Sequence, residues 1–129
     1  MLSSDELKRY HRHIILPGFG LEAQKKLKEA RILVVGAGGL GCPILQYLAA
    51  AGIGKIGIID GDRVEESNLQ RQVLFNVDDI GKNKARCAAE KLKLQNPFVE
   101  LEHFEFMLHK ENALNIISKY DLVIDGCDN

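Results

Sequence analysis

Short apolar runs alternate along this chain with segments of helical periodicity. Residues 31–36, RILVVG, form a continuous apolar run that ends in glycine, and a glycine-rich turn and the apolar segment 42–53 follow at once. A second apolar run, KIGIID, occupies residues 55–60. The order strand, turn, helix and strand predicts a β-α-β unit over about residues 31–60, which is the length that such a unit needs. Its crossover should be right-handed.

The alternation continues toward the C-terminus. Residues 82–96 carry alanine and leucine at helical spacing, and Pro97 ends the predicted helix. An edge strand is predicted over residues 99–106, a short helix over 111–120 and a buried strand over 121–125. Together these elements predict an α/β fold, a Rossmann-like, doubly wound, mainly parallel sheet with strand order 3-2-1-4.

Two helices are predicted before the first strand. Ser3 and Glu6 have the spacing of a capping box, and the periodicity that follows predicts a helix to about His13. Residues 17–20, PGFG, break this helix, and residues 21–30 have the pattern of a second, amphipathic helix.

A chain of 129 residues is long enough for one domain with a hydrophobic core. We divide it into an arm of N-terminal helices, residues 1–30, and a Rossmann-like region, residues 31–129. The sequence stops at Asn129, just past the carboxyl end of a predicted strand, where such folds place their ligands. We therefore expect the sheet to be incomplete and the sequence to be a fragment of a larger single domain.

Composition narrows the function classes. Apolar residues make up 46% of the chain and charged residues 27%, which is typical of a folded globular protein. The net charge of −1 gives no case for nucleic acid or an anionic membrane as a partner. No apolar run approaches the roughly 20 residues of a membrane span, and the N-terminus lacks the apolar stretch of a secretion signal, so we expect a cytoplasmic protein. Three cysteines, far apart and without a C-x-x-C pair, favour reduced thiols over a zinc site.

A glycine-rich turn and a following aspartate predict a nucleotide site. Gly36, Gly38 and Gly41 satisfy the Gly-x-Gly-x-x-Gly fingerprint between a predicted strand and helix, and Gly39 lies in the same turn. Such a turn brings backbone N–H groups and a helix N-terminus close to phosphates. Asp60 ends the second strand 22 residues after Gly38, where a carboxylate accepts hydrogen bonds from both ribose hydroxyls. The pattern disfavours NADP but leaves NAD, FAD and ATP open.

The long loop that follows favours ATP among these. Residues 61–81 are polar and show no clear periodicity. A compact domain rarely contains an irregular segment of this length unless the segment has a function. A dinucleotide's pyrophosphate is usually satisfied by the glycine turn, so further polar and cationic groups indicate a triphosphate or its leaving pyrophosphate. The candidate groups are Ser67, Asn68, Leu69, Gln70, Arg71 and Gln72 of the loop and Lys84 on the next helix.

Five segments in order, RYHRHIILPGFG, GAGGLGCP, DGDRVEESNLQRQ, GKNKA and the terminal DGCDN, together resemble the family of MoeB, ThiF and HesA, which is related to the enzymes that activate ubiquitin. The resemblance covers essentially the whole chain. It implies an adenylyltransferase that uses ATP and Mg²⁺ to adenylate the C-terminal Gly-Gly carboxylate of a small ubiquitin-like sulfur-carrier protein, with release of pyrophosphate. The carriers of molybdopterin and thiamine synthesis are the substrates that it suggests.

The resemblance also implies roles for individual residues. It assigns the adenosine to Gly39 and Asp60, and the phosphates to Asn68, Arg71 and Lys84.

Other positions take their roles from the resemblance alone. It makes Asp128 the magnesium ligand, beside Asn129, and Asp62 a nearby polar partner. Arg12, which the residues alone present as an exposed helix cation, corresponds to an arginine that reaches across a homodimer interface into the other ATP site, as an arginine finger does. The resemblance thereby implies that the arm of residues 1–30 serves the dimer and the ATP site, and that residues 31–129 are the nucleotide-binding region.

The implied chemistry needs no side-chain nucleophile, because the carrier's carboxylate attacks the α-phosphorus and only positioning and charge neutralisation are required. Arg12, Arg71 and Lys84 are therefore the candidate catalytic residues.

Members of the family normally continue beyond the DGCDN segment, often with two C-x-x-C pairs that bind zinc. This sequence holds no such ligands, so a structural Zn²⁺ would belong to the rest of a parent chain. Two alternatives to the enzyme are an NAD-binding oxidoreductase module and a non-catalytic partner subunit of the same fold.

Overall fold

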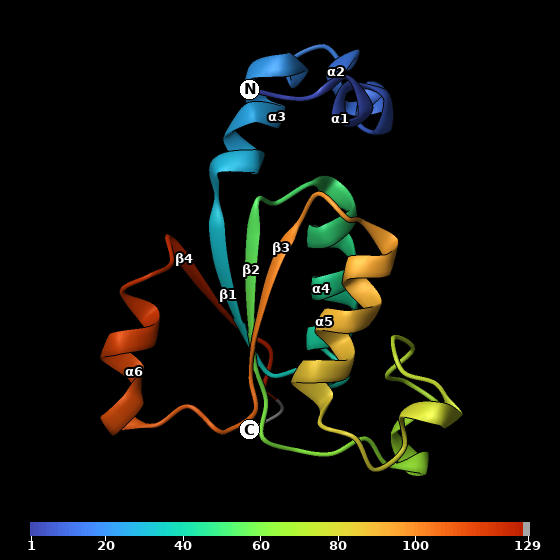
Figure 1. Ribbon diagram of the computed structural model, residues 1–129, viewed down its shortest axis with the longest axis vertical. Helices are drawn as coiled ribbons and strands as arrows, with labels where there is room; N and C mark the ends of the chain where they lie inside the picture. The colour runs from blue at the N-terminus through green and yellow to red at the C-terminus, as the bar shows by residue number, and fades with distance from the viewer. Residues whose placement is uncertain (128–129) are drawn as a thin grey trace.

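The computed structural model describes residues 1–127 as a four-stranded parallel sheet with helices on both faces (Figure 1). The strand order is β3-β2-β1-β4, as the sequence predicts. The strands are β1 (Arg31–Val35), β2 (Lys55–Ile59), β3 (Glu100–Phe104) and β4 (Leu122–Asp125). The helices are α1 (Ser4–Arg9), α2 (His11–Ile14), α3 (Gly20–Glu29), α4 (Gly41–Ala51), α5 (Lys84–Gln95) and α6 (Lys110–Ile117), with 3₁₀ turns η1 (Glu66–Asn68) and η2 (Val77–Asp79).

The sheet places the carboxyl ends of its strands at one edge. β1 is central and pairs in parallel with β2, from Arg31 opposite Lys55 to Val35 opposite Ile59, and with β4 on its other side. Because successive strands are parallel, each connection crosses back over a face of the sheet. The chain leaves β1 toward β2 but returns from β3 to the far side of β1, so a crevice opens at the carboxyl end of β1.

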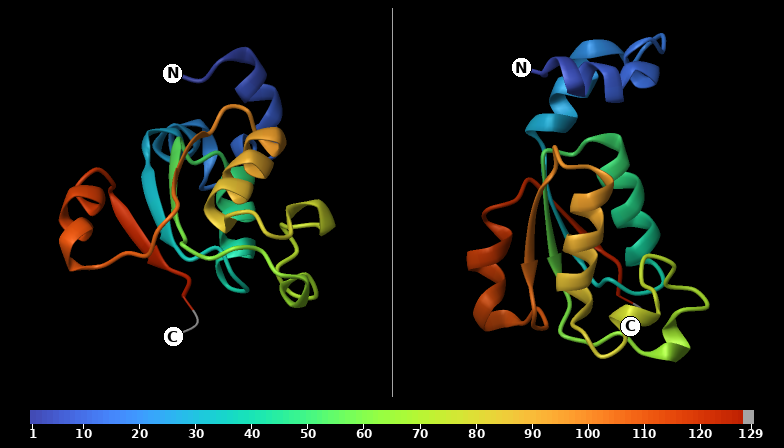
Figure 2. Two further views of the ribbon diagram at one scale, coloured as in Figure 1. Left: turned by 60° about the horizontal axis from the view of Figure 1, so that its bottom comes forward. Right: turned by 45° about the vertical axis from the view of Figure 1, so that its right-hand side comes forward.

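Two hydrophobic clusters hold the layers together. The larger lies between the sheet and the pair α4 and α5, and the smaller lies between the sheet and α6 (Figure 2). Adjacent residues of β1 serve opposite faces, since Leu33 joins the α6 cluster and Val34 the other, and both are fully buried. This double burial explains why β1 and β2 read as continuous apolar runs.

The N-terminal helices differ from the prediction. The capping box of Ser3 and Glu6 is present, but the predicted first helix breaks into α1 and α2 at Tyr10, whose backbone angles are φ −96° and ψ 12°. Tyr10 is 3% exposed, and its hydroxyl accepts a 2.8 Å hydrogen bond from Asn96 Nδ2 at the end of α5. A single straight helix was therefore wrong, because a tertiary contact fixes Tyr10 in a turn.

A second buried amide attaches this arm of helices to α4. Gln24 of α3 is fully buried, and its Nε2 donates to the carbonyl of Ala51 at 2.8 Å. Gln24 Oε1 lies 3.0 Å from His13 Nδ1. Because an amide oxygen can only accept a hydrogen bond, His13 Nδ1 must be the donor and must carry a proton. The arm lies at the amino ends of the strands, at the opposite end of the sheet from the glycine turn (Figure 1).

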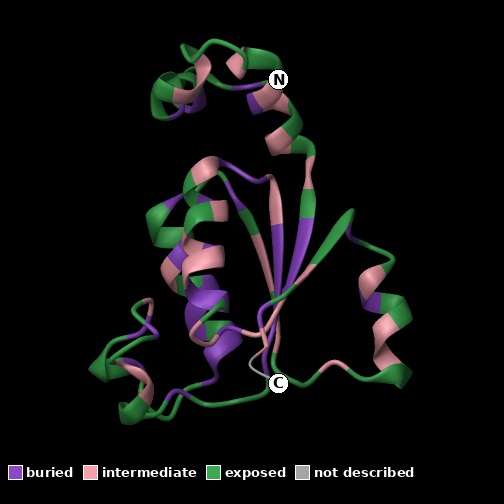
Figure 3. Ribbon diagram, turned by 180° about the vertical axis from the view of Figure 1, so that it is seen from behind, coloured by how far each residue is buried: buried purple, intermediate pink, exposed green. Residues whose placement is uncertain are grey.

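β4 is more exposed than the sequence predicts. Leu122 and Val123 are 54% and 37% exposed, and Figure 3 shows the strand largely green. The prediction of a buried strand was wrong for the described chain, because β4 is an edge of the described sheet and pairs only with β1. Apolar content predicts a strand, but it does not report how many neighbours cover that strand. β3, predicted as an edge strand, is the opposite edge.

The long loop of residues 61–81 is ordered by contacts at both ends. It contains η1 and η2, and the backbone of Val64 pairs with residues 81 and 82 near its end. Asp79, 6% exposed, forms a 2.8 Å ion pair with Lys91 of α5. The loop is thus attached to the same helix whose first residue is Lys84.

Candidate nucleotide site

Two compartments open at the carboxyl end of the sheet. One, of about 110 Å³, lies against the glycine turn and is lined by Val35, Gly36, Gly38, Ile59, Asp60, Asp62, Gln72, Lys84, Met107, Gly126 and Cys127. The other, of about 290 Å³, is strongly polar and is lined by Asp62, Arg63, Glu65, Asn68, Arg71, Gln72 and Lys84. We call them the turn pocket and the loop pocket. Because Asp62, Gln72 and Lys84 line both, they are two parts of one cleft.

The glycine turn has the conformation that its sequence predicts. Gly36 has φ +98°, a backbone region that other residues rarely adopt. A Cβ at Gly41 would lie 1.9 Å from the carbonyl oxygen of Gly36, so a side chain is excluded there. Gly126, after β4, packs against Gly41 from the other side. The three glycines allow the ends of β1 and β4 and the start of α4 to meet.

Asp60 is held in place by both of its carboxylate oxygens. The side chain is buried, Oδ2 accepts the backbone N–H of Ala37 at 2.8 Å, and Oδ1 accepts the backbone N–H of Asp62 at 2.8 Å. Each carboxylate oxygen can accept a second hydrogen bond, so these contacts leave capacity for ligand hydroxyls. The arrangement fixes the carboxylate before a ligand arrives.

Lys84 is positioned by the residue before it. Asn83 caps α5 by accepting the N–H of Arg86, and its Nδ2 donates to the carbonyl of Asp60 at 2.9 Å. The first turn of α5 is therefore attached to the end of β2. Lys84 is 7% exposed, and among residues 1–127 its ammonium has no carboxylate within ion-pair distance. A lysine so largely buried at the wall of a cleft suits an anion in that cleft, and the N-terminus of α5 adds partial positive charge beside it.

Asn68 and Arg71 line the loop pocket from η1. Asn68 Oδ1 accepts the backbone N–H of Glu65 at 3.0 Å, which orients the amide and leaves its NH₂ group as a donor. Arg71 is exposed; its Nη1 donates to the carbonyl of Ser67 at 3.3 Å, and its side chain lies over Gly39, with Cδ 3.7 Å from a Cβ placed there. Both side chains can therefore meet an anion that enters the loop pocket.

Within residues 1–127, the remaining residues predicted for the loop are not found in the lining of either pocket. Leu69 packs partly buried against the larger core cluster. Ser67 and Gln70 are exposed and do not line either pocket. Asp128 and Asn129, predicted to bind the cation and the nucleotide, lie outside the described residues.

Arg12, a further predicted site residue, lies at the opposite end of the sheet from this cleft. It is exposed on α2, at the amino ends of the strands, whereas the cleft lies at their carboxyl ends (Figure 1). Within one chain the body of the sheet separates Arg12 from Lys84.

The structure adds lining residues that the sequence did not single out. Met107 and Cys127 line the turn pocket, and Met107 lies so close to Gly61 that a Cβ there would be 3.2 Å from its Sδ. Met107 follows β3 and Cys127 follows β4. The rule that ligands bind at the carboxyl ends of parallel strands would have found both.

The two buried cysteines, Cys42 and Cys87, are not activated as nucleophiles. Burial raises the pKa of the Cys42 thiol to about 11, an effect that Lys84 only partly offsets. Burial also raises the pKa of Cys87 in the core under α5. Thiolates, not thiols, are the reactive form, so neither residue is activated.

No group of three His, Cys, Asp or Glu side chains among residues 1–127 is close enough to hold a metal ion by itself. In the same part of the chain, no helix has the length and apolar character of a membrane span.

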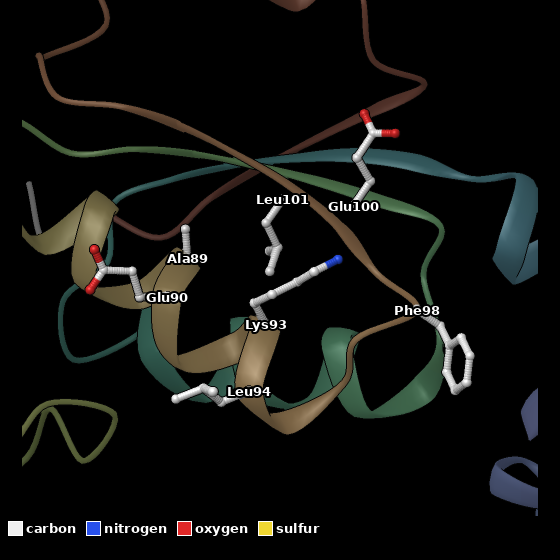
Figure 4. Close-up of a pocket in the computed structure, with 7 residues that line it drawn as sticks. All are labelled: Ala89, Glu90, Lys93, Leu94, Phe98, Glu100 and Leu101. Atoms are coloured by element: carbon white, nitrogen blue, oxygen red, sulfur yellow. The ribbon is translucent and has the colours of Figure 1, made fainter.

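A larger groove, of about 740 Å³, lies elsewhere, between α5 and β3 (Figure 4). Leu94, Phe98 and Leu101 give it an apolar lining, with Glu90 and Glu100 at its rim. Its one cation is already bound, because the Lys93 ammonium donates to the carbonyls of Pro97 and Val99. The groove therefore offers no group suited to a nucleotide's phosphates.

Comparison with known proteins finds close relatives over this whole region. A sulfur carrier protein adenylyltransferase of Thermus thermophilus is 53% identical over 127 residues, covering 98% of this chain and 47% of the relative. The probable adenylyltransferase/sulfurtransferase MoeZ of Mycobacterium tuberculosis is 52% identical over 128 residues, covering 99% of this chain and 33% of the relative. This chain thus spans less than half the length of either relative.

Solved structures agree with this relationship. The tRNA N6-threonylcarbamoyladenosine dehydratase TcdA of E. coli, in complex with ATP, superposes with a TM-score of 0.93 at 32% identity, over all of this chain and 53% of TcdA. MccB of E. coli, solved with MccA-N7isoASN, gives a TM-score of 0.83 at 32% identity over 99% of this chain and 38% of MccB. Residues 10–129 match the family model named ThiF, and the chain therefore belongs to the ThiF family.

Proposed function

We propose that this chain is the nucleotide-binding part of an ATP-dependent adenylyltransferase, which activates the C-terminal Gly-Gly carboxylate of a ubiquitin-like sulfur-carrier protein as an acyl-adenylate and releases pyrophosphate. The observation that carries the proposal is Lys84, a nearly buried lysine with no carboxylate partner in residues 1–127, in one cleft with the fixed carboxylate of Asp60. A ribose anchor and a cation that has no carboxylate partner within residues 1–127 suit a nucleoside phosphate when they line one cleft.

In this proposal, different residues of the chain contact different parts of the nucleotide. Asp60 accepts the ribose hydroxyls, and the glycine turn with the N-terminus of α4 receives the phosphate nearest the ribose. Lys84, Arg71 and the Asn68 NH₂ group bind the outer phosphates and stabilise the charge that develops on the pyrophosphate as it leaves. The attacking carboxylate comes from the carrier, so catalysis consists of positioning and charge neutralisation.

The loop pocket also suits a divalent cation. Its walls include Asp62 and Glu65, and Mg²⁺ is usually bound by one or two carboxylates together with substrate phosphates. When bound, the cation would neutralise phosphate charge. Asp128 remains the predicted direct ligand.

Arg12 completes the site only in a dimer. Because α2 and the cleft lie at opposite ends of the sheet, Arg12 serves the other protomer's cleft in this proposal, where its guanidinium would stabilise charge on the phosphates. The active form would then be a homodimer with two shared sites.

The names of the relatives support the substrate class. The T. thermophilus relative is named for a sulfur carrier protein, and a relative from Porphyra purpurea, 53% identical, is a probable molybdopterin-synthase adenylyltransferase. We propose that the substrate of this protein is a sulfur-carrier protein of the molybdopterin or thiamine type.

Titration calorimetry with Mg-ATP and, separately, with NAD tests the proposal. We expect Mg-ATP to bind preferentially and Lys84→Ala to weaken it by about tenfold or more, as loss of a charge-assisted contact of about 2 kcal/mol would do. The exposed Lys26→Ala is the matched control and should bind as the unmodified protein does. Preference for NAD would instead favour the oxidoreductase module. ATP binding without carrier-dependent pyrophosphate exchange at full length would favour the non-catalytic subunit.

A further inference from the structure

Tyr10 is the point at which the N-terminal arm is fixed to the body of the molecule. Its hydroxyl accepts a 2.8 Å hydrogen bond from Asn96 Nδ2, and the two residues are 3% and 0% exposed. The same Nδ2 donates to the carbonyl of Ala49, so one buried amide joins the arm to the ends of α4 and α5. A Cβ placed on Gly52 would lie 2.7 Å from Cζ of the Tyr10 ring. The arm therefore meets the body at a close and specific contact.

Tyr10 also fixes the start of α2, the helix that carries Arg12. Its carbonyl accepts the backbone N–H of His13 at 2.9 Å and that of Ile14 at 3.1 Å. The ring of His13 stacks on the ring of Tyr10, with the two planes 9° apart, and its Nδ1 donates to the buried Gln24. Arg12 therefore lies between two residues whose side chains are both held in place.

The side chain of Arg12 differs from that of its neighbour Arg9. Arg9 is engaged within its own chain, since its Nη1 donates to the carbonyl of Gln95 and its guanidinium lies 5.6 Å from the centre of the Phe98 ring. Arg12 is exposed and forms no hydrogen bond or ion pair within residues 1–127. The arm thus presents one uncommitted cation on a fixed stretch of backbone, which lowers the entropy lost when that cation meets an anion.

We propose that Tyr10 is a positioning residue for Arg12, and that its buried hydroxyl and ring hold the turn between α1 and α2 so that the Arg12 guanidinium meets the phosphates in the cleft of the other protomer. The inference rests on the proposed function, which assigns Arg12 to that cleft. Stabilisation of phosphate charge requires a donor in the correct place, so a small displacement of the arm weakens it.

This role has a direction. Because Tyr10 acts through Arg12, the Tyr10 of one chain serves the site that contains the Lys84 of the other chain. Loss of the hydroxyl should therefore impair the partner's cleft and leave the cleft of its own chain intact. A contact that only stabilises the fold would show no such asymmetry.

Mixed dimers of a full-length enzyme with this sequence test the direction. When Arg12→Ala chains are mixed with Lys84→Ala chains, only the mixed dimer contains a complete site, with its cleft in the first chain and its arginine from the second. Tyr10→Phe, which removes the hydroxyl and keeps the ring, is then added to one chain at a time. Carrier-dependent pyrophosphate exchange is measured with a sulfur carrier that ends in Gly-Gly.

We expect exchange to fall about tenfold when Tyr10→Phe is in the Lys84→Ala chain, which supplies the arginine. It should stay unchanged when Tyr10→Phe is in the Arg12→Ala chain, because that arm has no arginine to position. Retained exchange in the second mixture also shows that chains with Tyr10→Phe fold and pair. Tyr47→Phe is the matched control, since it makes the same chemical change at a 77% exposed position and should have no effect in either chain.

The other outcomes overturn the inference. A loss that is equal in the two mixtures, or larger with Tyr10→Phe in the Arg12→Ala chain, would mean that Tyr10 only supports the fold. Unchanged exchange in both would mean that the hydroxyl does not place Arg12. In these cases the starting pair still complements, and the proposed function stands. If the starting pair gives no exchange while unmodified dimers do, Arg12 does not act across the interface, and the inference fails with that part of the proposed function.

Discussion

The carboxylate of Asp60 joins the end of β2 to the glycine turn through a 2.8 Å hydrogen bond from the backbone N–H of Ala37. The same carboxylate accepts the N–H of Asp62 through its other oxygen, and Asn83 donates to the carbonyl of Asp60 from the start of α5. One residue therefore connects the turn, the long loop and the helix that carries Lys84. The group that anchors the ribose in our proposal is also the centre of the local structure.

This double role predicts that Asp60 cannot be replaced by its amide without loss of stability. Asn at position 60 would place an NH₂ group against one of two backbone N–H donors, so we expect Asp60→Asn to lower the free energy of unfolding by about 1–3 kcal/mol. Urea denaturation measures this change. Asp62→Asn is the control, because the Asp62 carboxylate is exposed and should change stability by less than about 0.5 kcal/mol. Equal effects of the two variants would contradict the bridging role.

Two glycines of the turn should differ in how much their replacement by alanine lowers the stability of the protein. Gly41→Ala places a methyl group 1.9 Å from the carbonyl oxygen of Gly36, so the turn must shift and we expect a loss of about 2 kcal/mol or more. Gly39→Ala meets only the flexible Arg71 side chain, at 3.7 Å, and should leave stability nearly unchanged. Thermal denaturation of the two variants tests the contrast, and a Gly39→Ala protein as unstable as Gly41→Ala would argue against the turn geometry.

Acid should release the attachment of the long loop to α5. Burial raises the pKa of the Asp79 carboxyl, but hydrogen bonds from Lys91 and the backbone N–H of Asn76, together with the charges of Lys91 and Lys82, lower it by more, so the pKa of Asp79 lies below its ordinary value. A carboxyl whose pKa is lower in the folded state than in the unfolded state stabilises the fold. This stabilisation is fully present above the pKa of the unfolded state, about 3.9, and it is lost as the pH falls through the pKa of the folded state.

The corresponding variant is Asp79→Asn, which keeps an oxygen for the N–H of Asn76 but removes the charge. We expect it to cost about 1–2 kcal/mol at pH 7 and progressively less below about pH 4. Urea denaturation at a series of pH values measures the difference from the unmodified protein. A cost that does not change with pH would show that the Lys91 charge is not responsible.

A shared active site predicts complementation between defective chains. In a full-length enzyme with this sequence, Arg12→Ala and Lys84→Ala should each abolish most carrier-dependent pyrophosphate exchange. Mixed dimers should recover one intact site, because one protomer supplies Lys84 and the other supplies Arg12. The control is the double variant Arg12→Ala/Lys84→Ala, which supplies neither residue and should give no recovery when it is mixed with either single variant. Absence of recovery in mixed dimers would refute the role of Arg12 across the interface.

Local patterns were sufficient for the architecture and for much of the cleft. Apolar runs of strand length, helical periodicity and the breaks at Gly and Pro predicted the order of elements, and the rule for doubly wound sheets then gave the strand order that is observed. The glycine spacing placed the turn, and Asp60 and Lys84 followed from their positions at the end of a strand and the start of a helix. These features depend on neighbours in sequence, which is why the residue pattern alone predicts them.

Contacts between distant segments decided the rest. The break at Tyr10 depends on Asn96, which lies 86 residues away, and the exposure of β4 depends on which strands flank it. The Gln72 Oε1 atom, buried without a hydrogen-bond partner in residues 1–127, is apparent only once its surroundings are known, and the separation of Arg12 from the cleft follows from the length of the sheet between them. Hydrogen-bond satisfaction and distance are properties of the packed molecule, and no spacing along the chain encodes them directly.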